Sequence, residues 1–137
     1  MNVTTHTFSI TTPPGTLDSV HELLRTVWEK SPEIDGQDQM RFETALIELT
    51  SNIFRHADDG LGISFSLTVR ITNKHIEAIL RDTGQPGEIN LTEVAMPDEL
   101  SESGRGIALI HALVDEFTYE REGKLNVWHI LKKKTEW

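Results

Sequence analysis

Residues 42–56 read F-E-T-A-L-I-E-L-T-S-N-I-F-R-H, and the rest of the chain is organised around this stretch. It has no Gly or Pro, and four of its apolar residues follow helical spacing: Phe42, Leu46, Leu49 and Ile53. This spacing predicts a long helix with one buried stripe. Glu48 and Asn52 are four residues apart, so they stack one turn above the other on a neighbouring face. Such a pair can act jointly on one ligand, although a Glu and an Asn on a helix are more often simply its solvated side.

The sequence around this stretch predicts a single domain spanning residues 1–137. Helical spacing predicts two further helices, at residues 17–29 and 104–114. Alternating β-branched and apolar residues predict five strands, at residues 3–10, 62–71, 75–80, 117–122 and 125–132. One face of the second strand is entirely apolar and is expected to be buried: Ile63, Phe65, Leu67, Val69 and Ile71. Residues 35–38 are predicted to form a turn, with Asp38 or a neighbour capping the long helix.

The predicted elements follow the order β-α-α-β-β-loop-α-β-β. Hairpin-linked strands with grouped helices indicate an α+β fold, a two-layer α/β sandwich. We expect a mixed, mainly antiparallel sheet that is covered on one face by three helices. Residues 82–103 show no clean period and are rich in acidic residues. A loop of this length inside a compact domain is typically a lid, a binding loop or a disordered segment.

The composition excludes several classes of function. The chain has no Cys, which rules out disulfides, thiolate metal sites and cysteine nucleophiles. Its 13 Lys and Arg against 22 Asp and Glu give a net charge of −9, and the only dense basic run is Lys132–Lys134. We therefore expect no direct nucleic-acid binding, which needs a basic footprint. No signal-peptide pattern or membrane-length apolar run is present, so a cytoplasmic protein without membrane contact is expected.

Two short motifs can carry chemistry. In Arg81–Gly87, R-D-T-G-Q-P-G, Asp82 leaves a strand and can accept from an exocyclic amine, while Gly84 lets a flat ring approach the backbone. The alternative is a plain turn. In S-G-R-G-I, Gly104, Arg105 and Gly106 open a helix, where free backbone N–H groups, the helix dipole and a guanidinium suit phosphate. The alternative is that these glycines only permit close packing.

Together, E-x-x-x-N on a helix, D-x-G after a strand and G-x-G opening a helix after a long loop resemble the GHKL (Bergerat-fold) ATP-binding superfamily. The resemblance covers nearly the whole chain. The small size and the form E-L-T-S-N-I-F-R-H-A are similar to the anti-sigma-factor serine/threonine kinases of the RsbW/SpoIIAB type. One departure is Pro86, which stands where the superfamily's D-x-G-x-G motif has its second glycine.

The resemblance implies ATP and Mg²⁺ as cofactors. Asn52 would hold Mg²⁺ together with the nucleotide phosphates, and Glu48 would be the catalytic base that takes the proton from a seryl or threonyl hydroxyl. Asp82 would bind the adenine amino group, with Gly84 giving the ring room.

The second glycine motif has its own implied role. Gly104, Arg105 and Gly106 would wrap the phosphates, and residues 85–103 would form the ATP lid. His56 faces the same side as Asn52 and could contact phosphate, but a histidine interacting with the end of the helix dipole is the more common case.

The resemblance also implies partners. The chain would sequester a sigma factor and phosphorylate an anti-sigma-factor antagonist of the STAS type, so that partner switching regulates transcription, and it would form a homodimer. Two alternatives remain: a non-catalytic nucleotide-responsive binding module, and a switch kinase that acts on a signalling enzyme rather than on a sigma factor.

Overall fold

A computed structural model describes residues 3–12, 16–56, 62–84 and 102–135. These residues form three helices, α1 (Leu17–Lys30), α2 (Gly36–His56) and α3 (Glu102–Leu113). They also form five strands, β1 (Thr4–Thr12), β2 (Ile63–Ile71), β3 (His75–Asp82), β4 (Glu116–Glu122) and β5 (Leu125–Lys133). The predicted order of elements is confirmed.

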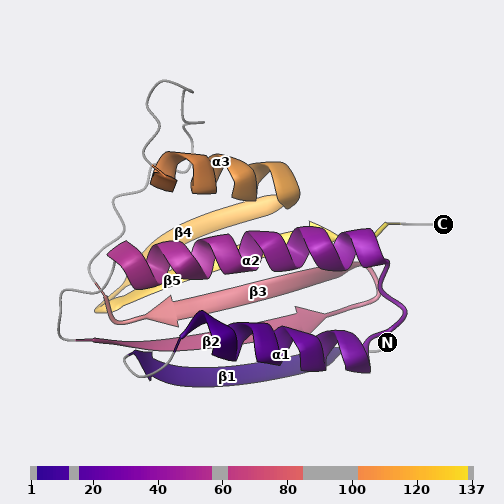
Figure 1. Ribbon diagram of the computed structural model, residues 1–137, viewed down its shortest axis with the longest axis horizontal. Coiled ribbons are helices and arrows are strands. Elements are labelled where there is room, and N and C mark those ends of the chain that lie inside the picture. Colours follow the sequence, from indigo (N-terminus) through magenta and orange to yellow (C-terminus); the bar gives the residue numbers. More distant parts are fainter. Residues whose placement is uncertain (1–2, 13–15, 57–61, 85–101, 136–137) are drawn as a thin grey trace.

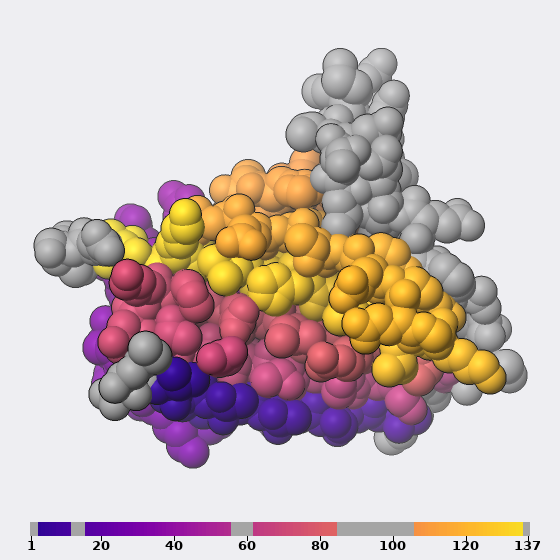
Figure 2. Space-filling model, turned by 180° about the vertical axis from the view of Figure 1, so that it is seen from behind, coloured from indigo at the N-terminus to yellow at the C-terminus, as the bar shows by residue number. Residues whose placement is uncertain are grey.

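The strands form one sheet in the order β1-β2-β3-β5-β4. Every neighbouring pair is antiparallel, so the expectation of a mixed sheet is wrong. The reason lies in the second half of the chain, where the β4–β5 hairpin returns β5 between β4 and β3 and thus antiparallel to both. The α+β sandwich is confirmed, because the three helices lie along one face of this sheet (Figure 1). From behind, strands occupy the middle of the molecule and no described helix crosses them (Figure 2).

The apolar stripes of the helices and of β2 build the core. All four predicted stripe residues of α2 and all five predicted inward residues of β2 are buried. α1 adds Val20, Leu24 and Val27 to the same core. α3 adds Ile107 and Ile110. The apolar residues that strand alternation and helix spacing predicted to be buried therefore face one shared core layer.

Two helix starts differ from their prediction. α2 begins at Gly36, inside the predicted turn, because the side chain of Asp35 accepts from the Gln37 backbone N–H at 2.8 Å and so caps the helix. α3 begins at Glu102, two residues before the predicted start. The predicted lid at 85–103 therefore overlaps the first turn of α3, and its residues 85–101 lie outside the described residues.

Hydrogen bonds join the N-terminal turn of α2 to the residues that follow β5. Asp38 is buried, and its carboxylate accepts from the Thr135 backbone N–H at 2.7 Å and from the Thr135 hydroxyl at 2.8 Å. Lys132 Nζ lies 3.6 Å from the same carboxylate. Burial raises the pKa of Asp38, but the Thr135 hydrogen bonds and the Lys132 charge outweigh it and hold that pKa below its ordinary value.

The ends of two helices and one strand meet at one end of the molecule, and the candidate site lies there. The end of α2, the end of β3 and the start of α3 all lie on the left in Figure 1. The turn between β4 and β5, where Gly123 has a φ of +59°, lies at this end as well (Figure 1). No helix among the described residues is long and apolar enough to cross a membrane.

Candidate functional site

The first part of the site is a close contact between α2 and α3. Glu48 is half-buried and Asn52 is only 2% exposed. A Cβ atom on Gly106 would lie 3.0 Å from Asn52 Nδ2 and 3.0 Å from Glu48 Oε2. Such distances are too short for a side chain without a shift of these neighbours. The structure therefore brings together three of the residues that the sequence singled out, and it does so because position 106 is a glycine.

The amide of Asn52 is held on one side and unpaired on the other. Its oxygen accepts from Arg55 Nη2 at 2.5 Å, and because a guanidinium only donates, this contact fixes which end of the amide is oxygen. The amide nitrogen is buried and has no hydrogen-bond partner among the described residues. A buried donor without a partner is costly and usually marks a place where a ligand or water belongs.

The first turn of α3 directly precedes Gly106. Gly104 falls within that turn, where backbone N–H groups have no partner inside the helix and the dipole is positive. Arg105 also lies in the first turn, but its side chain is outside the described residues, as is the side chain of His56. Their expected phosphate contacts remain predictions.

The second part of the site is Asp82 at the end of β3. Its side chain is fully buried, and three donors surround its carboxylate. The Gly84 backbone N–H donates to Oδ1 at 2.9 Å, Asn126 Nδ2 donates to Oδ1 at 2.8 Å, and Trp128 Nε1 donates to Oδ2 at 2.9 Å. A carboxylate can accept about four hydrogen bonds, so the described donors leave room for one more on Oδ2. Asp82 and Gly84 are thus brought together in one turn.

Sequence reasoning missed the side chains around Asp82. Asn126 and Trp128 come from β5, directly opposite Asp82 and Leu80 in the strand register. Arg121 of β4 donates to the Gly84 carbonyl oxygen at 3.0 Å. The alternation of β5 places Asn126, Trp128 and Ile130 on one face, and a buried Asn on that face was the available signal. Its contact with Asp82 joins residues 44 positions apart and could not be read from the sequence.

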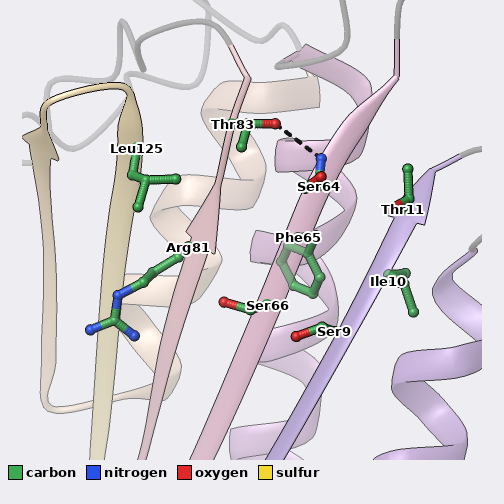
Figure 3. A pocket seen from close by; sticks show the side chains of 9 residues that line it. All are labelled: Ser9, Ile10, Thr11, Ser64, Phe65, Ser66, Arg81, Thr83 and Leu125. Atoms are coloured by element: carbon green, nitrogen blue, oxygen red, sulfur yellow. Dashed lines mark hydrogen bonds between the residues drawn. The ribbon is translucent and has the colours of Figure 1, made fainter.

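A hollow of about 390 Å³ lies on the opposite, helix-free face of the sheet (Figure 3). It is lined mainly by hydroxyl side chains of β1 and β2, with Arg81 and Thr83 from the end of β3. Thr83 Oγ1 accepts from the Ser64 backbone N–H at 3.0 Å. Because strand side chains alternate, Arg81 and Thr83 point away from Asp82. The hollow therefore contains none of the predicted site residues.

Comparison with known proteins identifies the fold. Residues 13–131 match the family model described as a histidine kinase-like ATPase domain. Among solved structures, the chain is similar to the histidine kinase AdeS of Acinetobacter baumannii, with a TM-score of 0.51 and 18% sequence identity. That alignment covers 99% of this chain and 70% of the AdeS chain. At this identity the similarity describes the fold alone. No curated protein matches the chain.

Proposed function

The chain belongs to the histidine kinase-like ATPase family, and on this premise we propose that it is an ATP- and Mg²⁺-dependent protein serine/threonine kinase that also acts as an anti-sigma factor. Membership of the family by itself indicates an ATP-binding domain with ATPase or kinase-like activity. The serine/threonine specificity and the partners are the proposed part.

One observation carries the nucleotide site: the amide nitrogen of Asn52 is buried next to Gly106 and has no hydrogen-bond partner in the part of the chain that the structure describes. A donor in this position needs an acceptor, and a phosphate oxygen is an acceptor that the positive end of α3 also favours. Because residue 106 is a glycine, it has no Cβ atom to cover the neighbouring Glu48 and Asn52 side chains. The residues present therefore fit a nucleotide phosphate.

The remaining residues would each contact a different part of the nucleotide or its metal ion. Asp82 would accept from the adenine amino group through the open position on Oδ2, with Gly84 giving the ring access. Gly104 would offer its backbone N–H to phosphate. Asn52 would hold Mg²⁺ through its amide oxygen, and bound Mg²⁺ supplies charge neutralisation of the phosphates with few protein ligands.

Glu48 supports the proposed phosphoryl transfer. It lies one helical turn before Asn52, and its Oε2 faces Gly106. A carboxylate in this place would accept the proton of a seryl or threonyl hydroxyl as that oxygen attacks the γ-phosphorus of ATP and ADP leaves with the bridging oxygen.

The proposed partners follow from the family resemblance of the sequence and from charge. We expect the substrate to be a STAS-type antagonist that loses its hold on the kinase when phosphorylated, and the sequestered protein to be a sigma factor, with the kinase acting as a homodimer. The net charge of −9 favours encounter with a basic, DNA-binding protein.

A second candidate function is a nucleotide-responsive binding module without catalysis. The contact between Arg55 and the Asn52 oxygen favours it, because the guanidinium occupies the oxygen that a metal ion would need. Nucleotide binding would then report to a partner without phosphoryl transfer.

Transfer of labelled γ-phosphate from ATP to the candidate STAS protein, in the presence of Mg²⁺, separates the two functions. Wild type and Glu43→Gln are expected to transfer phosphate, whereas Glu48→Gln is expected to bind ATP without transfer. Glu43 is a matched control, because it lies on the same helix, is half-buried, and needs only an acceptor oxygen for its bond from Trp28 Nε1. No phosphoserine or phosphothreonine with wild type, with ATP still bound, would exclude the kinase and leave the binding module. Equal transfer by wild type and Glu48→Gln would exclude only Glu48 as the base.

A further inference from the structure

Asn126, near the start of β5, links the Asp82 carboxylate to two side chains of β4. It is fully buried. Its amide nitrogen donates to Asp82 Oδ1 at 2.8 Å and lies 3.4 Å from the Gly84 carbonyl oxygen, which it also contacts as a donor. Its amide oxygen accepts from the Tyr119 hydroxyl at 2.6 Å and from Arg121 Nη1 at 3.0 Å. Both ends of the amide are therefore engaged.

These contacts determine which end of the Asn126 amide faces Asp82. A guanidinium can only donate, so the end that faces Arg121 must be the oxygen. A reversed amide would put its NH₂ group against the guanidinium and its oxygen against the Asp82 carboxylate. The donor end is thus held toward Asp82, and the carboxylate is held in turn.

The same side chains also hold the turn that follows Asp82. Arg121 Nη1 donates to the Gly84 carbonyl oxygen at 3.0 Å while it contacts Asn126. The Gly84 backbone N–H donates to Asp82 Oδ1 at 2.9 Å. The carboxylate and the backbone against which a flat base would lie therefore share one buried network, and neither can turn without breaking contacts to the other.

We infer that Asn126, oriented by Tyr119 and Arg121, is a positioning residue that sets base selectivity at this site. The inference rests on the proposed nucleotide function. Asn126 fixes the Asp82 carboxylate as an acceptor whose open position is on Oδ2. That geometry accepts a 6-amino group and opposes a 6-oxo group, because two acceptors would then face each other.

A positioning role and a purely structural role have different consequences. When the carboxylate is no longer held, it can rotate away from an opposing 6-oxo group. The repulsion that weakens binding of a 6-oxo base then falls, and so does the hydrogen-bond energy that favours a 6-amino base. Discrimination between bases is then lost. If Asn126 only supported the fold, its removal would weaken both bases equally.

Inosine triphosphate is the suitable probe, because it carries a 6-oxo group where ATP carries the 6-amino group. Binding of ATP and of inosine triphosphate, each with Mg²⁺, would be measured by calorimetry for the whole chain. The variants are wild type, Asn126→Leu, Tyr119→Phe and Thr118→Val. Thr118→Val is the matched control for Tyr119→Phe, since it removes one hydroxyl from the same strand on the opposite sheet face. Tyr119→Phe keeps the ring beside Trp128 and also tests the proposal if Asn126→Leu does not fold.

For Asn126→Leu we expect ATP to bind on the order of tenfold more weakly and inosine triphosphate to change by less than about threefold, as for loss of one charge-assisted hydrogen bond. Tyr119→Phe should show a smaller change of the same kind, and Thr118→Val none. Equal weakening of both nucleotides in a folded Asn126→Leu, or unchanged discrimination in Tyr119→Phe, would overturn the inference alone. Wild type that binds neither nucleotide would overturn the proposed function as well.

Discussion

Gly106 of α3 lies so close to Asn52 of α2 that a Cβ atom on the glycine would stand 3.0 Å from the Asn52 amide nitrogen. The two helices therefore meet at the side chain to which the proposed function assigns Mg²⁺ and phosphate. This close contact is possible because Gly106 has no side chain. It explains how the buried amide nitrogen is left without a hydrogen-bond partner among the described residues.

Gly106→Ala should weaken nucleotide binding by on the order of tenfold or more, because the added methyl group displaces Asn52 and Glu48. The free energy of unfolding should change by only about 1 kcal/mol, since alanine favours the helix while the contact opposes it. Gly36→Ala is the matched control: it also replaces a glycine in the first turns of a helix, but nothing lies within 4 Å of the new Cβ. Calorimetric titration with ATP and Mg²⁺ checks both. Wild-type affinity in Gly106→Ala would mean that this contact is not part of the site.

Arg55→Ala should lower the Mg²⁺ concentration that half-saturates nucleotide binding by about fivefold. The guanidinium donates to the Asn52 oxygen, and removal of a competing hydrogen bond is worth about 1 kcal/mol. Nucleotide binding would be titrated with Mg²⁺ at fixed ATP. Arg25→Ala, an exposed arginine on α1, should leave the midpoint unchanged. A higher Mg²⁺ requirement in Arg55→Ala would instead make Arg55 a support of the metal site.

Asp38→Asn should destabilise the fold by about 1–3 kcal/mol at neutral pH, because Asp38 is buried and accepts two hydrogen bonds from Thr135. The folded-state pKa of Asp38 is lowered from 3.8. The contribution of its charge is therefore fully present above about pH 3.8 and is lost as the pH falls through the lower folded-state value.

Urea unfolding at pH 7 and at several values below pH 4 checks the Asp38 prediction. The gap in stability between wild type and Asp38→Asn should narrow toward acid, and Thr135→Val should show a smaller loss of the same sign at pH 7. A gap that stays constant with pH would show that the charge of Asp38 does not contribute.

Local patterns predicted most of the fold. The spacing of Phe42, Leu46, Leu49 and Ile53 and the alternation of β2 each point to one buried face, and all of these residues are buried. The predicted start of α2 was wrong because capping depends on which acidic residue turns inward: Asp35 caps α2, while Asp38 bonds to Thr135 from the far end of the chain. That second contact joins residues 97 positions apart, which no local pattern can show.

The site divides in the same way. The roles of Glu48, Asn52, Asp82 and Gly106 remain predictions, but these residues were singled out from residue type and spacing. Asn126 and Trp128 were not, because β5 has apolar residues on both faces and its pairing with β3 depends on a long connection. Arg55 was missed although it lies three residues after Asn52, a spacing that places two side chains on one helix face. Asn126 and Trp128, in contrast, hold Asp82 through contacts between residues far apart in the sequence.

Asp82 is the proposed ligand of the adenine when this chain binds ATP. Calorimetric titration of ATP with Mg²⁺ into wild type, Asp82→Asn and Thr83→Ala tests this assignment. Thr83 lies in the same turn but points to the opposite sheet face, so it controls for disturbance of the turn (Figure 3). Wild type and Thr83→Ala should bind ATP with similar affinity, while a folded Asp82→Asn should bind about 10- to 100-fold more weakly, as for loss of a hydrogen bond to a charged group. Wild-type affinity in folded Asp82→Asn would contradict the claim.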